Sequence, residues 1–93
     1  MAGFEWDEEK AARNLIDHRV SFEQAALACR DPFAVEWVDE RDDYGEERIG
    51  LLGLYGREVL FVAYTERGEH IRIITARRAE RHEQNRYYRE NSE

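Results

Sequence analysis

The 93-residue chain has a single cysteine, a single proline and a single lysine, and it contains no long apolar run. One cysteine, Cys29, cannot form an internal disulfide, which favours a reducing compartment. No stretch is apolar enough for a membrane span, and the N-terminal segment MAGFEWDEEK is too acidic for a signal peptide. These absences predict a cytoplasmic protein that does not bind a membrane.

Metal and cofactor motifs are absent as well. His18, His70 and His82 lie in different expected elements, without the spacing of zinc ligands. The acidic segment 39–47 lacks a glycine where a calcium loop requires one, and the chain has no glycine-rich phosphate loop. Cys29 falls on the apolar face of an expected helix, where a buried, inert thiol is the better interpretation. We therefore expect no metal and no cofactor.

Charge is divided unevenly along the chain. The net charge is −7, but residues 1–47 hold five basic and fourteen acidic side chains, a net of −9, whereas residues 48–93 hold nine and seven, a net of +2. Segment 67–89 has seven arginines against three acids, a net of +4. Arginine beside tyrosine suits phosphates and stacked bases, which makes RNA the first ligand to consider. The alternative is an arginine-rich helix paired with its own acids.

The order of patterns predicts one α+β domain over residues 1–93, with two N-terminal helices, an antiparallel sheet of three to four strands and a C-terminal helix. Asp7 is a good N-cap for the first helix, and Ser21 with Gln24 forms a capping-box pattern for the second. The expected strands are 33–39, 48–55, 58–65 and 70–76. The last helix is expected to begin at about Arg77.

Three finer expectations follow from periodicity. Phe4-Glu5-Trp6 is either a short edge strand or an apolar plug. The first helix has an apolar stripe at helical spacing, which predicts its buried face: Ala11, Ala12, Leu15 and Ile16. The consecutive apolar residues 59–62 indicate a central strand covered on both faces.

Cleavage of RNA needs neither a protein nucleophile nor a metal, because RNA carries its own nucleophile, the 2′-OH. The reaction needs a base, an acid and cations around the phosphorus, roles that histidine and arginine suit. His18 follows the first helix and is either such a group or a C-cap of that helix. Because side chains alternate between the two faces of a strand, we expect Arg72 and Arg77 to lie on opposite faces of the last strand unless that strand ends near Thr75.

The chain resembles the BrnT toxins of BrnT/BrnA type II toxin–antitoxin modules along nearly its whole length. The two most specific pieces are the opening FEWD with Lys10, Asn14 and His18, and the block YTERG followed by IRIITAR. Further matching pieces are VSFE at 20–23, Asp31-Pro32, DYGEER at 43–48, Gly53, Glu83 and Tyr87.

The resemblance implies a RelE-like fold and a metal-independent endoribonuclease that inhibits translation. It also implies neutralisation by a BrnA-like ribbon-helix-helix antitoxin in a heterotetramer, which contacts operator DNA only through the antitoxin. The residues that it implies for catalysis are His18, Arg48, Arg67 and Arg77. Those implied for RNA binding are Lys10, Arg72, Tyr64 and Tyr87, with the tyrosines stacking on bases.

The chain departs from the family where BrnT proteins usually read Lys-His-Gly-Val and this chain reads Asp17-His18-Arg19-Val20. The missing lysine removes a cation beside His18, and an arginine in place of glycine disfavours positive φ at that turn. A second hypothesis is therefore a toxin-fold protein with a weak or inactive site that mainly binds its antitoxin and co-represses its operon.

Overall fold

A computed structural model describes residues 3–40 and 46–92 and contains one five-stranded sheet and three helices. The strand order is β1-β5-β4-β3-β2, with β1 parallel to β5 and every other pair antiparallel. The elements in chain order are β1 (Phe4–Glu5), α1 (Glu8–His18), α2 (Phe22–Ala28), β2 (Val35–Asp39), β3 (Arg48–Tyr55), β4 (Glu58–Arg67), β5 (His70–Arg78) and α3 (Arg81–Glu90).

The α+β class is confirmed, but the strand count differs from the expectation. Phe4 and Glu5 form the fifth strand, which runs parallel beside Ile71 and Arg72. The last strand continues to Arg78, so α3 begins four residues later than the sequence pattern indicates. The expected acidic loop at 39–47 lies partly outside the described residues, since 41–45 are among those not described.

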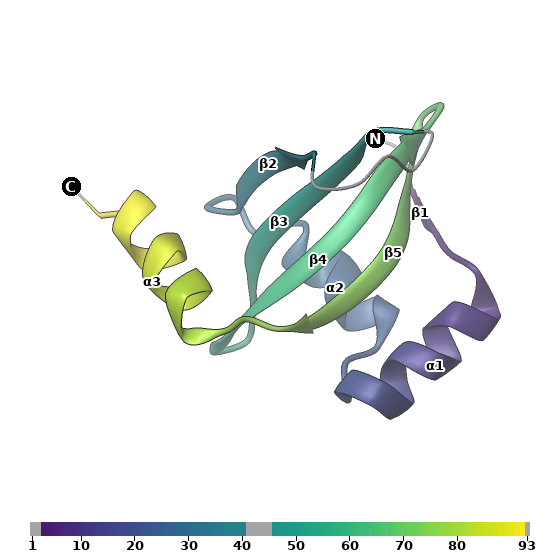
Figure 1. Cartoon of the computed structure of the whole chain (residues 1–93), viewed down its shortest axis with the longest axis horizontal. Helices are drawn as coiled ribbons and strands as arrows, with labels where there is room; N and C mark the ends of the chain where they lie inside the picture. Colours follow the sequence, from purple (N-terminus) through teal and green to yellow (C-terminus); the bar gives the residue numbers. More distant parts are fainter. Residues whose placement is uncertain (1–2, 41–45, 93) are drawn as a thin grey trace.

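The helices lie on different sides of the sheet. In Figure 1, α2 lies behind β3 and β4, α1 lies beyond the β5 edge, and α3 lies at the left, where it contacts β3 and β4. We call the surface packed by α2 the α2 face; its core includes Phe22, Leu51, Val62 and Ile73. We call the opposite surface, which α3 partly covers, the α3 face.

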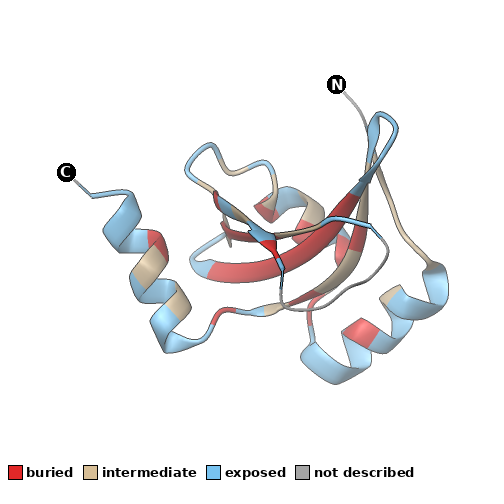
Figure 2. Cartoon of the chain, turned by 45° about the horizontal axis from the view of Figure 1, so that its top comes forward, coloured by how far each residue is buried: buried red, intermediate tan, exposed pale blue. Residues whose placement is uncertain are grey.

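The central strand β4 is buried on both faces, as its apolar run predicts. Leu60, Val62 and Tyr64 belong to the α2-face core, and Val59, Phe61 and Ala63 belong to the α3-face core. Figure 2 shows this buried stretch running through the middle of the sheet. No helix in the described parts of the chain is long and apolar enough to span a bilayer.

The helix starts follow the sequence signals. The Asp7 carboxylate accepts hydrogen bonds from Glu9 N at 2.8 Å and Lys10 N at 3.2 Å. Ser21 and Gln24 bond reciprocally, at 3.0 Å from Gln24 N to Ser21 Oγ and at 2.9 Å from Ser21 N to Gln24 Oε1. Each cap satisfies backbone donors that the first helical turn leaves unpaired.

The predicted buried face of α1 is wrong in most of its members. Only Ala11 is packed against the core, whereas Leu15 and Ile16 are 49% and 76% exposed and Ala12 is exposed too. The buried residue of α1 is Asn14, which is 6% exposed. A polar side chain therefore faces inward and the apolar stripe faces solvent.

Asn14 attaches α1 to the free edge of β5. Its Nδ2 donates to Ala76 O at 2.8 Å and to Val20 O at 2.9 Å. Its Oδ1 accepts from Ala76 N at 3.2 Å and from Thr75 Oγ1 at 3.0 Å. The side-chain amide thus pairs with Ala76 as a neighbouring strand would, at a place where β1 no longer runs beside β5.

A β-bulge shifts the register of β5. Ala63 pairs with Thr75 and Tyr64 pairs with Ile73, so Ile74 is an extra residue between two paired positions. The insertion reverses the alternation of faces, because strand side chains alternate with a period of two. Arg72 and Arg77 therefore both point to the α3 face, and their expected placement on opposite faces is wrong.

The first prediction concerns Asn14. Replacing Asn14 by alanine leaves buried backbone groups of Ala76 and Val20 without partners, and we expect the free energy of unfolding to fall by about 2–4 kcal/mol. Urea unfolding at neutral pH measures this loss. Ile16→Gln on the same helix is the matched control and is expected to change stability by less than about 0.5 kcal/mol. Equal effects of the two substitutions would contradict the role given to Asn14.

A second prediction concerns Asp31, which joins the end of α2 to α3. Burial alone would raise the pKa of Asp31, but hydrogen bonds from Tyr87 Oη and from Phe33 N and Leu54 N outweigh it and hold this pKa below 3.8. A carboxyl with a lowered folded-state pKa stabilises the fold above its unfolded pKa, and this stability is lost as pH falls through the folded value.

We therefore expect Asp31→Asn to be less stable than the wild type at neutral pH and to lose less stability between about pH 5 and pH 2. Urea unfolding across that range measures both effects. The control is Asp17→Asn, an exposed carboxylate on α1. An unchanged acid slope in Asp31→Asn would refute this account.

Candidate functional site

The chemistry-bearing side chains gather in two places, the first of which is a hollow between α1 and the edge of β5. The hollow has a volume of about 360 Å³. Lys10, Asn14 and His18 follow one another at intervals of four residues, so all three lie on the same side of α1. Its lining residues are Asp7, Glu9, Lys10, Arg13, Asn14, Asp17, His18, Ile74 and Thr75.

Asn14 positions this hollow. It holds the middle of α1 against Thr75 and Ala76, while Lys10 and His18 lie one helical turn to either side of it. His18 is the last residue of the helix and is exposed. The imidazole and the ammonium group therefore flank one opening beside the β5 bulge.

The turn after His18 has a left-handed residue. Arg19 adopts φ 60° and ψ 29°, and its N–H donates to Leu15 O at 2.9 Å. Among the described residues it is the one non-glycine position with positive φ. The turn thus has the conformation that glycine favours, and this chain adopts it with arginine at a steric cost.

The second place is the α3 face of the sheet, where Arg48, Arg72 and Arg77 point. Arg48 and Leu52 share this face by alternation, and Leu52 lies in the α3-face core. Thr65 on β4 pairs with Arg72, and Glu5 pairs with Arg72 on its other side. Three of the predicted arginines therefore share one surface.

Each of these arginines has a partner. Arg72 Nη1 donates to Glu5 Oε2 at 3.0 Å. Arg77 donates to Glu83 through two parallel bonds of 2.9 and 3.0 Å, and its Nη1 also donates to Arg78 O at 3.2 Å. Asp39 is the cross-strand neighbour of Arg48. Charge on this face is arranged in pairs of opposite sign.

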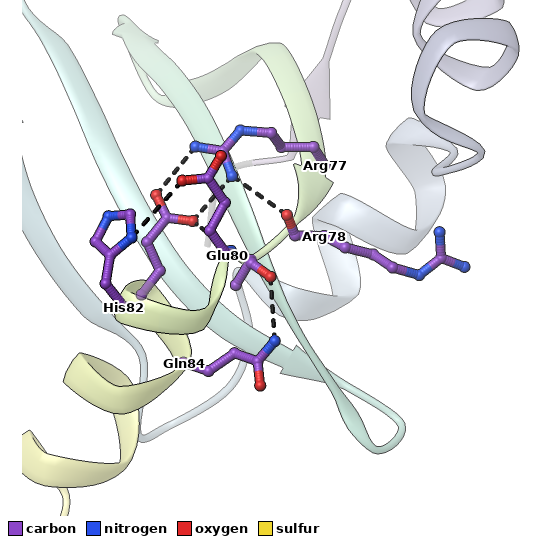
Figure 3. A network of polar contacts seen from close by, with 7 residues as sticks. Arg77, Arg78, Glu80, His82 and Gln84 are labelled. Atoms are coloured by element: carbon purple, nitrogen blue, oxygen red, sulfur yellow. Dashed lines mark hydrogen bonds and ion pairs between the residues drawn. The ribbon is translucent and has the colours of Figure 1, made fainter.

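The Arg77–Glu83 pair belongs to a polar network at the start of α3. Figure 3 shows Arg77 reaching over the β5–α3 junction, with Glu80 and His82 beside it. Burial alone would raise the pKa of Glu83, but the hydrogen bonds from Arg77 and from Glu80 N hold it below its usual value. The carboxylate is therefore charged at neutral pH, and the pair fixes both elements.

The remaining predicted residues lie elsewhere. Arg67 is at the far end of β4, where Nε lies 3.5 Å from Glu46 Oε1 and both side chains are exposed. Tyr64 is 5% exposed in the α2-face core and donates to Glu36 Oε2 at 3.0 Å; burial, and then Glu36, raise its pKa. Tyr87 is 3% exposed and donates to Asp31 Oδ2. Neither tyrosine offers an open ring face for a base.

Sequence reasoning missed two aromatic residues on the α3 face. Trp37 and Phe61 lie beneath the guanidinium groups of Arg86 and Arg77, each at 4.5 Å from the ring centroid. The signal that could have identified Trp37 is its position opposite Gly50 on the neighbouring strand. That pairing can be recognised only once the register of β2 against β3 is known. Cys29 is only partly buried, at the C-cap of α2, but its thiol stays protonated: burial, and then Glu36, raise its pKa to about 12.

Fold and side chains together define a small α+β protein whose cationic groups surround one sheet edge and one sheet face. Among the described residues, no group of three His, Cys, Asp or Glu side chains could hold a metal ion. Residues 6–83 match the family model described as the ribonuclease toxin BrnT of type II toxin–antitoxin systems. The chain therefore belongs to the BrnT family.

A solved structure supports the same fold. The crystal structure of the Brucella abortus ribonuclease toxin BrnT superposes with a TM-score of 0.71 at 20% sequence identity, over 87% of this chain and 100% of that chain. This likeness shows the fold. No curated protein matches the chain in sequence.

The third prediction tests the strained turn after His18. Arg19→Gly should raise the free energy of unfolding by about 0.5–1 kcal/mol, because glycine adopts a left-handed conformation without the steric cost that an L side chain has. Thermal and urea unfolding measure the gain. Arg19→Ala removes the same charge but keeps Cβ, and it should show no such gain. If both variants are stabilised equally, the effect comes from charge and not from the backbone.

Proposed function

We propose that this BrnT-family protein is a metal-independent endoribonuclease that cleaves RNA to inhibit translation. The observation that carries the proposal is the hollow in which Lys10 and His18 flank Asn14 at the edge of β5. An imidazole and an ammonium group at one opening provide a proton acceptor and a cation for the phosphorus centre.

In this mechanism the 2′-oxygen attacks the adjacent phosphorus while His18 takes up its proton. The bond from phosphorus to the 5′-oxygen breaks, and the 5′-oxygen takes a proton from solvent. The products carry a 2′,3′-cyclic phosphate and a 5′-hydroxyl, and His18 returns its proton to solvent. Lys10 stabilises the charge that builds up on the non-bridging oxygens. Every group in this scheme comes from RNA, α1 or solvent, so no metal is needed.

The arginines of the α3 face would hold the flanking RNA. Ile74 and Thr75 line the hollow and lie between Arg72 and Arg77 along β5. An RNA strand that crosses the β5 edge at the bulge would pass from the hollow to these arginines. The resemblance implies catalysis by Arg48, Arg67 and Arg77; we propose instead that Arg48 and Arg72 bind phosphates of the flanking RNA and that Arg67 is a more distant contact at the end of β4. Arg77, whose fork is held by Glu83, lies on the same face beside them.

Family membership implies an antitoxin partner, since type II systems pair a toxin with a protein antitoxin. We propose that this partner is a BrnA-like ribbon-helix-helix protein, that the complex is a heterotetramer with operator contacts through the antitoxin, and that it works in the cytoplasm. The RelE-like relationship of the fold belongs to the same proposal.

A second candidate function is a weak toxin that serves mainly as the antitoxin's partner. Two observations favour it: Asp17 adds a negative charge to the hollow of His18, and the fork of Arg77 is occupied by Glu83. Both reduce the positive potential available to a phosphate.

The fourth prediction separates the two functions. Antitoxin-free protein incubated with single-stranded RNA and excess EDTA should produce fragments ending in 2′,3′-cyclic phosphate. His18→Ala and Lys10→Ala should each slow cleavage by about 100-fold or more. His70→Ala is the matched control, because His70 is an exposed histidine at the start of β5 and does not line the hollow.

Three outcomes are informative. Cleavage that stops in EDTA refutes metal independence. A fully active His18→Ala variant refutes the assignment of the hollow. RNA left intact by the wild type, in a preparation that still binds antitoxin, supports the weak-toxin alternative.

A further inference from the structure

The α3 face carries two stacks of arginine on an aromatic ring, side by side. Arg77 lies over Phe61 and Arg86 lies over Trp37, each with Cζ 4.5 Å from the ring centroid. The two rings are themselves 6.0 Å apart between centroids. They surround a cavity of about 210 Å³ lined by Trp37, Leu52, Phe61, Arg77, His82, Glu83 and Arg86.

The Trp37 stack has a layered construction. Gly50 lies directly beneath the indole, since a Cβ at this position would come within 2.6 Å of the ring carbons Cε2 and Cζ2. Arg86 covers the other side of the ring, and its side chain is 35% exposed. The outermost layer of the stack is therefore a guanidinium plane that solvent can reach.

Acidic partners orient both guanidinium groups. Glu83 accepts two bonds from the fork of Arg77, and Glu90 accepts from Arg86 Nε at 2.9 Å. These contacts reduce the positive charge that a phosphate would meet. Both side chains remain partly exposed, at 31% for Arg77 and 35% for Arg86, so a ligand can still reach the guanidinium groups. Flat guanidinium and aromatic faces are the surfaces on which unpaired RNA bases stack.

We propose that Arg86 on Trp37, together with Arg77 on Phe61, forms a subsite for one unpaired nucleobase of the RNA substrate. The cavity is smaller than the roughly 300–1,000 Å³ of pockets that enclose a whole drug-sized ligand, which fits a single base with its sugar outside. The inference rests on the proposed ribonuclease function for the identity of its ligand. It assigns base recognition to Arg86 on Trp37 with Arg77 on Phe61 beside them, and not to Tyr64 or Tyr87.

The test measures binding apart from cleavage. A fluorescent single-stranded 2′-O-methyl RNA cannot be cut through its 2′-oxygen, so its affinity reports binding alone. Arg86→Lys keeps the positive charge but removes the planar guanidinium group on which a base would stack. It should weaken binding of this RNA by about fivefold or more. Replacing the stacked nucleotide by an abasic one should weaken wild-type binding by a similar factor and leave Arg86→Lys binding unchanged.

Controls address folding and charge. Arg89→Lys, an exposed arginine on the same helix, should bind like the wild type. Trp37→Leu should lose the same base-dependent affinity, and thermal unfolding of each variant shows whether α3 remains folded. A folded Arg86→Lys variant with wild-type affinity would overturn the subsite.

Other outcomes also decide. An Arg86→Lys variant that loses equal affinity for the intact and the abasic RNA would show that the lost guanidinium contact does not involve the base, and this too refutes the subsite. Absence of any wild-type binding to the oligonucleotide refutes it as well. Base-dependent binding without cleavage of ordinary RNA would leave the subsite standing and refute only the ribonuclease mechanism.

Discussion

The side chain of Asn14 forms with β5 the hydrogen bonds that a neighbouring strand would form. Its amide both donates to and accepts from the backbone of Ala76, and it reaches Thr75 and Val20 as well. A buried amide is tolerated only when its hydrogen bonds are made, and here four contacts make them. The position of α1, and with it the opening that holds Lys10 and His18, depends on this one side chain.

Local signals in the sequence predicted the parts of the fold that local chemistry decides. The caps at Asp7 and at Ser21 with Gln24 were readable because a cap involves residues no more than three apart. Strand β4 could be predicted because a short run of consecutive apolar residues is typical of a strand that is buried on both faces. The grouping of Lys10 with His18 came from the family resemblance and not from a local signal.

Long-range contacts decided what the sequence did not predict. The apolar stripe of α1 pointed to the wrong face, because the edge of β5, 62 residues away, requires Asn14 and not Leu15. Counting by two failed along β5, because the bulge at Ile74 exists only in relation to β4. Tyr64, which was expected to stack on RNA bases, is buried in the α2-face core. Trp37 lies on the α3 face because it pairs with Gly50 across the strands.

Gly50 has an evolutionary consequence beyond this chain. A single methyl group at that residue would collide with the indole of Trp37, so positions 37 and 50 cannot vary independently. A relative with a larger residue at the glycine position must turn its aromatic ring away from β3 or do without one. Covariation of these two alignment columns with position 86 would then divide the family into members that keep the layered stack and members that hold their last helix by other contacts.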